Sequence, residues 1–175
     1  MCRLSAPDLT QVPTGTGVFL DANIFVYALL GESRECQQIL QRCIQQEIYG
    51  VTTLSVISDV THKLMLAEAC ATGLIASRLD WKKLRRNPDA VMRLSRYWRH
   101  TLSILGMNLL VTVPELSHLH GAQSVRATHG LMTGDSLIVA AMQHSGISVL
   151  LSRDDDFDHV AGLRRYAPSD LPSQS

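Results

Sequence analysis

Short apolar segments alternate with longer amphipathic segments along almost the whole chain, and this alternation limits the possible folds more than any other feature. Four apolar runs bounded by turn residues are predicted to be strands, and they cover residues 17–20, 49–53, 108–113 and 148–151. Segments in which the apolar residues have helical spacing separate these runs. Parallel strands need such crossover connections, so the order favours an α/β fold with a mainly parallel central sheet flanked by helices.

The segments between the strands are predicted to be helices with one apolar face. They cover residues 22–30, 33–47, 56–72, 114–129 and 136–145. Two further helices, residues 75–86 and 89–105, are separated by Pro88 and precede the third strand. We expect these two helices to form a helical hairpin inserted into the domain.

The length of 175 residues fits one domain that buries its own hydrophobic core. Hydrophobic residues make up 46% of the chain and charged residues 18%, which argues against disorder. We expect an N-terminal extension over residues 1–16, a single folded domain over residues 17–167 and a loose C-terminal tail over residues 168–175.

Charge and cysteine content exclude several classes of protein. Sixteen basic side chains balance sixteen acidic ones, so no global field would attract a nucleic acid. The chain shows no signal peptide and no apolar stretch of the roughly 20 residues that span a membrane, so we expect a soluble cytoplasmic protein. No Cys-x-x-Cys pair suggests zinc, and Cys36 and Cys43 fall on an apolar helix stripe as reduced core residues.

Four aspartates stand at strand ends or near helix starts. Asp21 follows the first strand, Asp59 lies in the first turns of a helix, Asp135 precedes a helix and Asp154 follows a late strand. Functional groups gather beyond the carboxyl ends of parallel strands, and carboxylates that converge there repel one another unless a cation neutralises them. The pattern therefore predicts a metal site. Oxygen ligands favour Mg²⁺ or Mn²⁺ over zinc, and these ions suit the hydrolysis of phosphate esters.

Each aspartate also has a purely structural interpretation. Asp21 and Asp135 are good N-cap residues, the run from Asp154 to Asp156 is typical of a solvated turn, and Asp59 could simply face solvent. Only the spacing and the placement of all four together favour a metal site over these alternatives.

Three blocks that span most of the chain carry a family resemblance. They are VFLDAN at residues 18–23, SDVTHKL at residues 58–64, and residues 130–157, which include TGDSL and SRDDDF. In this order they resemble the PIN-domain family, and in particular its VapC-type toxin ribonucleases. The last block is the most specific of the three.

The resemblance assigns roles to residues of this chain. The metal ligands that it implies are Asp21, Asp135 and Asp154. The supporting residues are Asn23, which would order the first acid, Ser152, which would support the last, and Asp156. At the fourth acidic position the family usually has glutamate in a Glu-Val pair, whereas this chain has Asp59-Val60. Aspartate keeps the charge but shortens the reach by about one 1.5 Å bond, so we expect weaker activity.

The function that the resemblance implies is an endoribonuclease dependent on Mg²⁺ or Mn²⁺, in the setting of a toxin-antitoxin pair. RNA would be the substrate, a small antitoxin the partner, and a homodimer is plausible. Two alternatives stay open: an RNA-processing or structure-specific nuclease without an antitoxin, and a catalytically weakened PIN-like module that binds RNA or protein. Asn23 argues against a haloacid-dehalogenase-type phosphatase, which would need an aspartate at that position.

Three arginines form a possible RNA contact. Arg93, Arg96 and Arg99 follow one another at three-residue steps in the second helix of the predicted hairpin. On one helix they would share a face, while the residues expected to pack inward are Val91, Leu94, Trp98 and Leu105. This face could bind RNA phosphates, and the alternative is an ordinary solvated helix surface.

Overall fold

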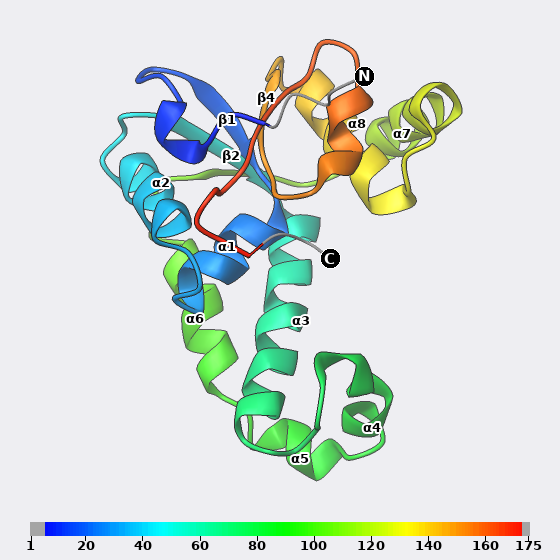
Figure 1. Ribbon diagram of the computed structural model, residues 1–175. Coiled ribbons are helices and arrows are strands. Elements are labelled where there is room, and N and C mark those ends of the chain that lie inside the picture. Colours follow the sequence, from blue (N-terminus) through cyan, green and yellow to red (C-terminus); the bar gives the residue numbers. More distant parts are fainter. Residues whose placement is uncertain (1–5, 173–175) are drawn as a thin grey trace.

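A parallel sheet forms the centre of the computed structural model, which describes residues 6–172 (Figure 1). Its strands lie in the order β3-β2-β1-β4-β5, and all neighbouring pairs are parallel. They are β1 (Gly17–Leu20), β2 (Tyr49–Thr53), β3 (Leu110–Thr112), β4 (Val149–Leu151) and β5 (Arg164–Tyr166). The three central strands are almost entirely buried, as expected for a parallel sheet covered on both faces. The predicted α/β class is confirmed.

The edge strand β5 is the one that the sequence did not predict. It has three residues, and two of them are arginines. Arg165 is nevertheless buried, whereas Arg164 is exposed. No apolar run marks such a strand, because one of its buried side chains is charged.

Helices cover both faces of the sheet. They are α1 (Ala22–Leu29), α2 (Arg34–Ile44), α3 (Leu54–Ala71), α7 (Leu116–His129) and α8 (Thr133–His144). Figure 1 shows α7 and α8 packed together on one side of the sheet, with α1 and α2 on the other. No helix in the described part of the chain is long and apolar enough to cross a membrane.

The main hydrophobic core lies between the sheet and these helices, and its most buried side chains include Phe19, Ile24 and Leu150. Cys36 and Cys43 belong to this core as free thiols. Burial raises the pKa of Cys36 to about 12 and that of Cys43 to about 11, so both stay protonated at neutral pH. Their predicted place in the core is confirmed.

A helical insertion packs along α3, which projects away from the sheet (Figure 1). It contains α4 (Trp81–Arg85), α5 (Pro88–Met92) and α6 (Arg96–Ile104), preceded by the single turn η2 (Arg78–Asp80). The insertion was predicted, but it contains three short helices where two longer ones were expected. A second, smaller cluster of buried side chains holds it to α3, and its members are Leu66, Ala69, Ile75, Leu84, Ala90 and Leu94.

The break between α5 and α6 has a physical cause on α3. The carboxylate of Glu68 accepts hydrogen bonds from the backbone nitrogens of Ser95 (3.0 Å) and Tyr97 (2.7 Å). These nitrogens stand at the start of α6, where a helix has no internal partners for its N–H groups. Leu94 is buried just before them. A tertiary contact therefore starts a new helix at a point that local spacing does not mark.

The break separates the three arginines. Arg93 ends α5, whereas Arg96 and Arg99 lie on α6. The prediction that all three share one helical face is therefore wrong. Of the four residues expected to pack inward, Leu94 is buried and Val91 packs against the smaller cluster. Trp98 and Leu105 are instead 52% and 66% exposed. RNA binding by the arginines stays a prediction.

Segments on both sides of the expected domain contact it. The single turn η1 (Leu9–Gln11) places Leu9 in the main core. In the expected tail, the structure describes residues 168–172, and Asp170 accepts hydrogen bonds from Ser33 Oγ and the backbone nitrogen of Arg34, both at 2.7 Å. These bonds cap the start of α2.

Candidate metal centre

The sheet topology brings two distant segments together beyond the carboxyl ends of β1 and β4. Leu20 pairs with Leu151 in the parallel register, so Asp21 and Ser152 follow neighbouring strands at the same edge. β1 lies between β2 and β4, so the order of strands reverses at this place. Ligands of open α/β sheets bind at such a reversal point. The acids were predicted to converge at this edge.

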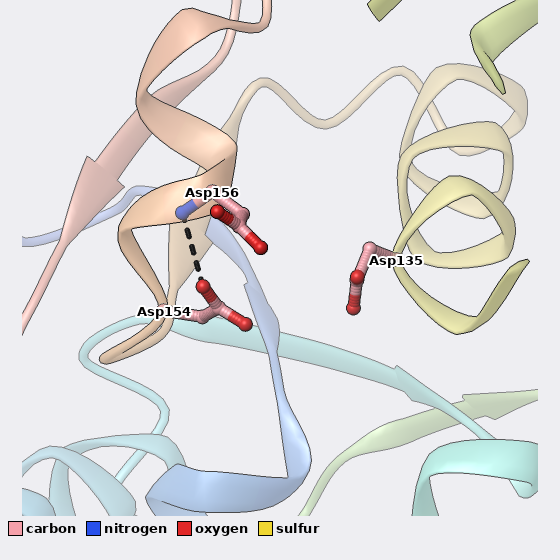
Figure 2. A group of neighbouring side chains, drawn as sticks. All are labelled: Asp135, Asp154 and Asp156. Atoms are coloured by element: carbon pink, nitrogen blue, oxygen red, sulfur yellow. Dashed lines mark hydrogen bonds between the residues drawn. The ribbon is translucent and has the colours of Figure 1, made fainter. Parts of the chain in front are cut away.

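Three carboxylates form a compact group there. One oxygen each of Asp135, Asp154 and Asp156 lies within 4.8 Å of the other two (Figure 2). Asp135 lies in the first turn of α8, while Asp154 and Asp156 belong to the loop after β4 and to the short helix η3 (Asp155–His159). The backbone nitrogen of Asp156 also donates to Asp154 Oδ1 at 3.0 Å. The group thus joins one helix start to one strand end.

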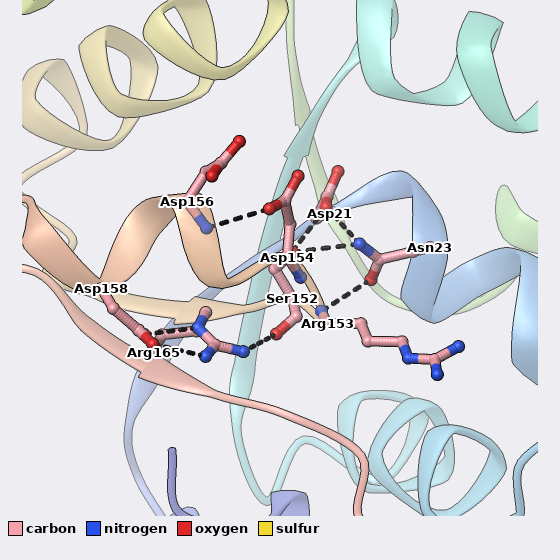
Figure 3. A network of polar contacts seen from close by, with 8 residues as sticks. All are labelled: Asp21, Asn23, Ser152, Arg153, Asp154, Asp156, Asp158 and Arg165. Atoms are coloured by element: carbon pink, nitrogen blue, oxygen red, sulfur yellow. Dashed lines mark hydrogen bonds and ion pairs between the residues drawn. The ribbon is translucent and has the colours of Figure 1, made fainter. Parts of the chain in front are cut away.

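Asp21 lies beside Asp154 of this group (Figure 3), and three donors hold its carboxylate in place. Its carboxylate accepts hydrogen bonds from the backbone nitrogen of Ala22 (2.6 Å), Asn23 Nδ2 (2.6 Å) and Ser152 Oγ (2.7 Å). Burial raises the pKa of Asp21, and the negative charge of Asp154 adds to this, although the hydrogen bonds act against it. The side chain is therefore both fixed and electrostatically crowded.

An ion pair between the buried Arg165 and the more exposed Asp158 supports the loop that carries Asp154 (Figure 3). Arg165 donates to both carboxylate oxygens of Asp158, at 2.7 Å and 2.8 Å, and to the carbonyl oxygen of Ser152 at 3.1 Å. Ser152 Oγ in turn accepts a hydrogen bond from the backbone nitrogen of Asp154 at 3.0 Å. Because the Arg165 side chain is only 6% exposed, these contacts hold β5, η3 and the loop together.

Asp59 lines the same pocket, but its carboxylate contacts a lysine. Lys63 Nζ lies 2.7 Å from Asp59 Oδ2, one helical turn further along α3. In the described part of the chain, the compact acidic group does not include Asp59. The pocket has a volume of about 240 Å³, and its polar lining residues are Asp21, Asn23, Ser55, Asp59, Lys63, Asp135 and Asp154.

The electrostatics of the pocket suit a divalent cation. Burial raises the pKa of Asp135 to about 6, and the charges of Asp154, Asp21 and Asp156 add to the effect. A bound cation would remove this repulsion. The compact group offers carboxylate oxygens and no sulfur or imidazole, which fits Mg²⁺ or Mn²⁺ better than zinc.

The structural alternatives for the acids have different outcomes. Asp21 is the N-cap of α1 and Asp154 the N-cap of η3, so capping and a place in the acidic pocket coexist at both positions. Asp135 is not an N-cap, because α8 begins at Thr133 and its cap position is Met132. Capping therefore does not account for Asp135.

Two residues of this region were missed by the sequence analysis. Lys63 stands four residues after Asp59 on a helix, so the spacing of ion pairs on helices could have identified their contact. Arg165 gave no comparable signal, because its partner Asp158 is separated from it by a turn and lies outside any helical repeat.

Comparison with known proteins identifies the family. The family model described as "PIN domain" matches residues 18–163, and the chain therefore belongs to the PIN-domain family. No curated protein matches the sequence. The match to the PIN-domain model agrees with the resemblance seen in the sequence.

Several solved structures share the fold at low sequence identity. VapBC2 from Rickettsia felis, bound to a DNA fragment from the promoter, matches with a TM-score of 0.57 at 12% identity. The alignment covers 87% of this chain and 98% of the other chain. A toxin-antitoxin complex from Klebsiella pneumoniae has a TM-score of 0.52 at 15% identity, with 89% and 99% covered. The sarcin-ricin loop cleaving toxin VapC20 from Mycobacterium tuberculosis has a TM-score of 0.54 at 14% identity, with 84% and 98% covered.

Proposed function

We propose that this protein is an endoribonuclease that hydrolyses RNA phosphodiester bonds with Mg²⁺ or Mn²⁺. The observation that carries the proposal is the group of Asp135, Asp154 and Asp156 oxygens within 4.8 Å at the reversal point of a PIN-domain sheet. VapC20, a structural neighbour described as a toxin that cleaves the sarcin-ricin loop, supports RNA as the substrate.

The side chains have distinct parts in this proposal. Asp135, Asp154 and Asp156 would hold the ion, and Asp21 and Asp59 would complete the acidic wall of the pocket. When bound, the ion supplies an activated water and neutralises charge on the phosphodiester. With a pKa of about 6, Asp135 is mostly ionised at neutral pH and can serve as a ligand. The three donors to Asp21 fix that carboxylate before substrate arrives, which avoids a cost of ordering it later.

The biological setting that we propose is a toxin-antitoxin pair. One of the structural neighbours, from Klebsiella pneumoniae, is described as a toxin-antitoxin complex, which supports a small antitoxin as the partner. Toxicity on expression, relieved by a small protein encoded beside this one, would support the setting, whereas a nuclease that is harmless when expressed would favour an RNA-processing role. A homodimer and a cytoplasmic location stay predictions. Light scattering of the purified protein tests whether it forms a homodimer.

RNA cleavage by the purified protein tests the proposed activity. We expect cleavage of single-stranded RNA with Mg²⁺ or Mn²⁺, and its loss with a chelator and in Asp135→Asn. Cleavage that persists in the folded Asp135→Asn protein would contradict the assignment of the site.

A second candidate is a PIN-like binding module with weakened catalysis. The contact between Asp59 and Lys63 favours this candidate, because the carboxylate at the family's fourth acidic position forms an ion pair with a lysine. RNA binding without metal-dependent cleavage by the folded wild-type protein would select this candidate.

A further inference from the structure

Lys63 brings a positive charge into an acidic pocket. Among the described residues that line this pocket, it is the one lysine or arginine, and Asp21, Asp59, Asp135 and Asp154 line the same space. Its charge lowers the pKa values of Asp21 and Asp135, opposing the larger effect of burial. The ammonium group therefore acts on carboxylates that come from β1 and α8 as well as on its own helix.

The contact with Asp59 fixes where this charge lies. Lys63 Nζ and Asp59 Oδ2 are 2.7 Å apart at i and i+4 positions of α3, and the two side chains are 45% and 48% exposed. An ammonium group has three N–H donors and no acceptor. With one donor directed at Asp59, two are left for an oxygen that enters the pocket.

A phosphodiester needs such a donor in this place. The backbone of RNA is anionic, and the pocket wall carries four aspartates, so substrate and wall repel one another wherever the acids are not neutralised. Lysine is a common point-charge ligand of phosphate oxygens. Ordinary solvated ion pairs at i and i+4 positions contribute only about 0.3–0.5 kcal/mol, so stability alone gives little reason for this lysine.

We propose that Lys63 binds a phosphate oxygen of the RNA backbone at the acidic pocket, and that Asp59 acts by positioning the Lys63 ammonium group. The proposal rests on the proposed ribonuclease function and adds a substrate-binding residue to it. Asp135, Asp154 and Asp156 would hold the ion, while Lys63, positioned by Asp59, would bind the substrate beside it.

The test compares variants that remove or keep this charge. Binding of a labelled single-stranded RNA oligonucleotide is measured by fluorescence anisotropy in the Asp135→Asn background, so that the RNA stays intact. Lys63→Met should weaken binding about tenfold, as expected for a charge-assisted hydrogen bond of about 1.4 kcal/mol, and should flatten the slope of log Kd against log salt by about 0.7. Lys63→Arg should recover most of the affinity.

Lys83→Met provides the matched control. Lys83 also contacts an aspartate one turn before it, with Nζ 3.4 Å from Asp80 Oδ1, but it does not line the acidic pocket. We expect less than a twofold change in affinity for this variant. A loss equal to that of Lys63→Met would show a general charge effect and overturn the proposal.

Metal binding tests the role of Asp59 separately. Mn²⁺ affinity, measured by electron paramagnetic resonance without RNA, should fall strongly in Asp135→Asn but little in Asp59→Asn, and Lys63→Met should not weaken it. Equal losses in Asp59→Asn and Asp135→Asn would make Asp59 a ligand and overturn its positioning role. In cleavage assays Lys63→Met should raise KM more than it lowers kcat.

The two levels of the proposal fail in different ways. If the wild-type protein neither binds nor cleaves RNA, the proposed function is wrong. If the wild-type protein cleaves RNA with metal and Lys63→Met binds and cleaves equally well, only the assignment of Lys63 is wrong.

Discussion

Two carboxylates in different regions of the molecule have pKa values that are shifted in opposite directions. Asp135, in the acidic pocket at the sheet edge, has its pKa raised by burial and by three neighbouring aspartates. Glu68 lies on the half of α3 that carries the insertion. Burial acts to raise its pKa too, but the backbone N–H groups of Ser95 and Tyr97 outweigh this and lower it. The fold therefore supplies Glu68 with hydrogen-bond donors, whereas the surroundings of Asp135 disfavour its charged form.

The acidic pocket should lose function without losing the fold. Asp135→Asn is expected to lower metal-dependent RNA cleavage by about 100-fold or more, because it removes a charged ligand from the compact group. Asp21→Asn should act in the same direction. Circular dichroism should show both variants folded. Cleavage at the wild-type rate in both would remove the catalytic assignment from these residues.

A substitution in the contact between α3 and the insertion should lower stability without lowering activity. Glu68→Ala leaves the backbone nitrogens at the start of α6 without their acceptor, so the free energy of unfolding should fall by about 1–3 kcal/mol. Cleavage per folded molecule should stay within about twofold of wild type, since the acidic pocket is formed elsewhere. Denaturant titration measures the first effect and an assay at matched folded fractions the second. A large loss of specific activity would show that the two regions are coupled.

The pH dependence of metal-free stability should separate the two carboxylates. The folded-state pKa of Asp135 is raised from 3.8 to about 6, so its contribution is fully present below about pH 3.8 and is lost as the pH rises through 6. The pKa of Glu68 is lowered from 4.5, so its contribution is present above pH 4.5 and is lost as the pH falls through its folded-state pKa.

Asp135→Asn should therefore stabilise the metal-free protein at pH 7. Removing the repulsion is worth about 1–2 kcal/mol after allowance for solvent screening, and the lost interaction with the start of α8 offsets about 0.3–1 kcal/mol. Thermal unfolding in a chelator at pH 4 and pH 7 measures the difference. A variant that is less stable than wild type at pH 7 would mean that the carboxylates do not repel one another in the folded protein.

The same contrast explains what the sequence could predict. Asp21 follows β1 directly and Asp154 follows β4 after two residues, so alternation of strands and helices was enough to place them at one sheet edge. The start of α6 depends on Glu68, which is 27 residues away from Ser95 in the chain and has no local signature. β5 was missed for a related reason, because its buried Arg165 is compensated by Asp158 and by a carbonyl oxygen of the loop after β4. Local patterns reveal elements that bury apolar side chains, and they miss those defined by tertiary polar contacts.

The smallest expected effect concerns the arginines beside the insertion. Arg96 and Arg99 share α6 at i and i+3 positions, whereas Arg93 ends the preceding helix. Glu68 accepts a hydrogen bond from the backbone nitrogen of Tyr97 in the first turn of α6. It lies nine residues along α3 from Asp59, which is about 13 Å at 1.5 Å per residue. RNA bound at the acidic pocket would have to extend about this far to reach Arg96, whereas Arg99 lies one turn further along α6, which returns towards the pocket and places Thr101 beside Thr61. We therefore expect Arg96→Ala with Arg99→Ala to weaken RNA binding only about threefold and to flatten the salt slope by about 1.4, or 0.7 for each lost phosphate contact.

Arg93→Ala tests whether all three arginines bind RNA together or only Arg96 and Arg99 on α6 do so. This variant should leave the affinity and the salt slope unchanged, because its side chain stands on the other side of the helix break. Fluorescence anisotropy across a salt series, in the Asp135→Asn background, measures both quantities for each variant. If Arg93→Ala weakens binding as much as the double variant does, the break in the helix does not divide the arginines functionally. If neither variant changes the slope, the three arginines form a solvated surface, and the phosphate contacts are confined to the acidic pocket.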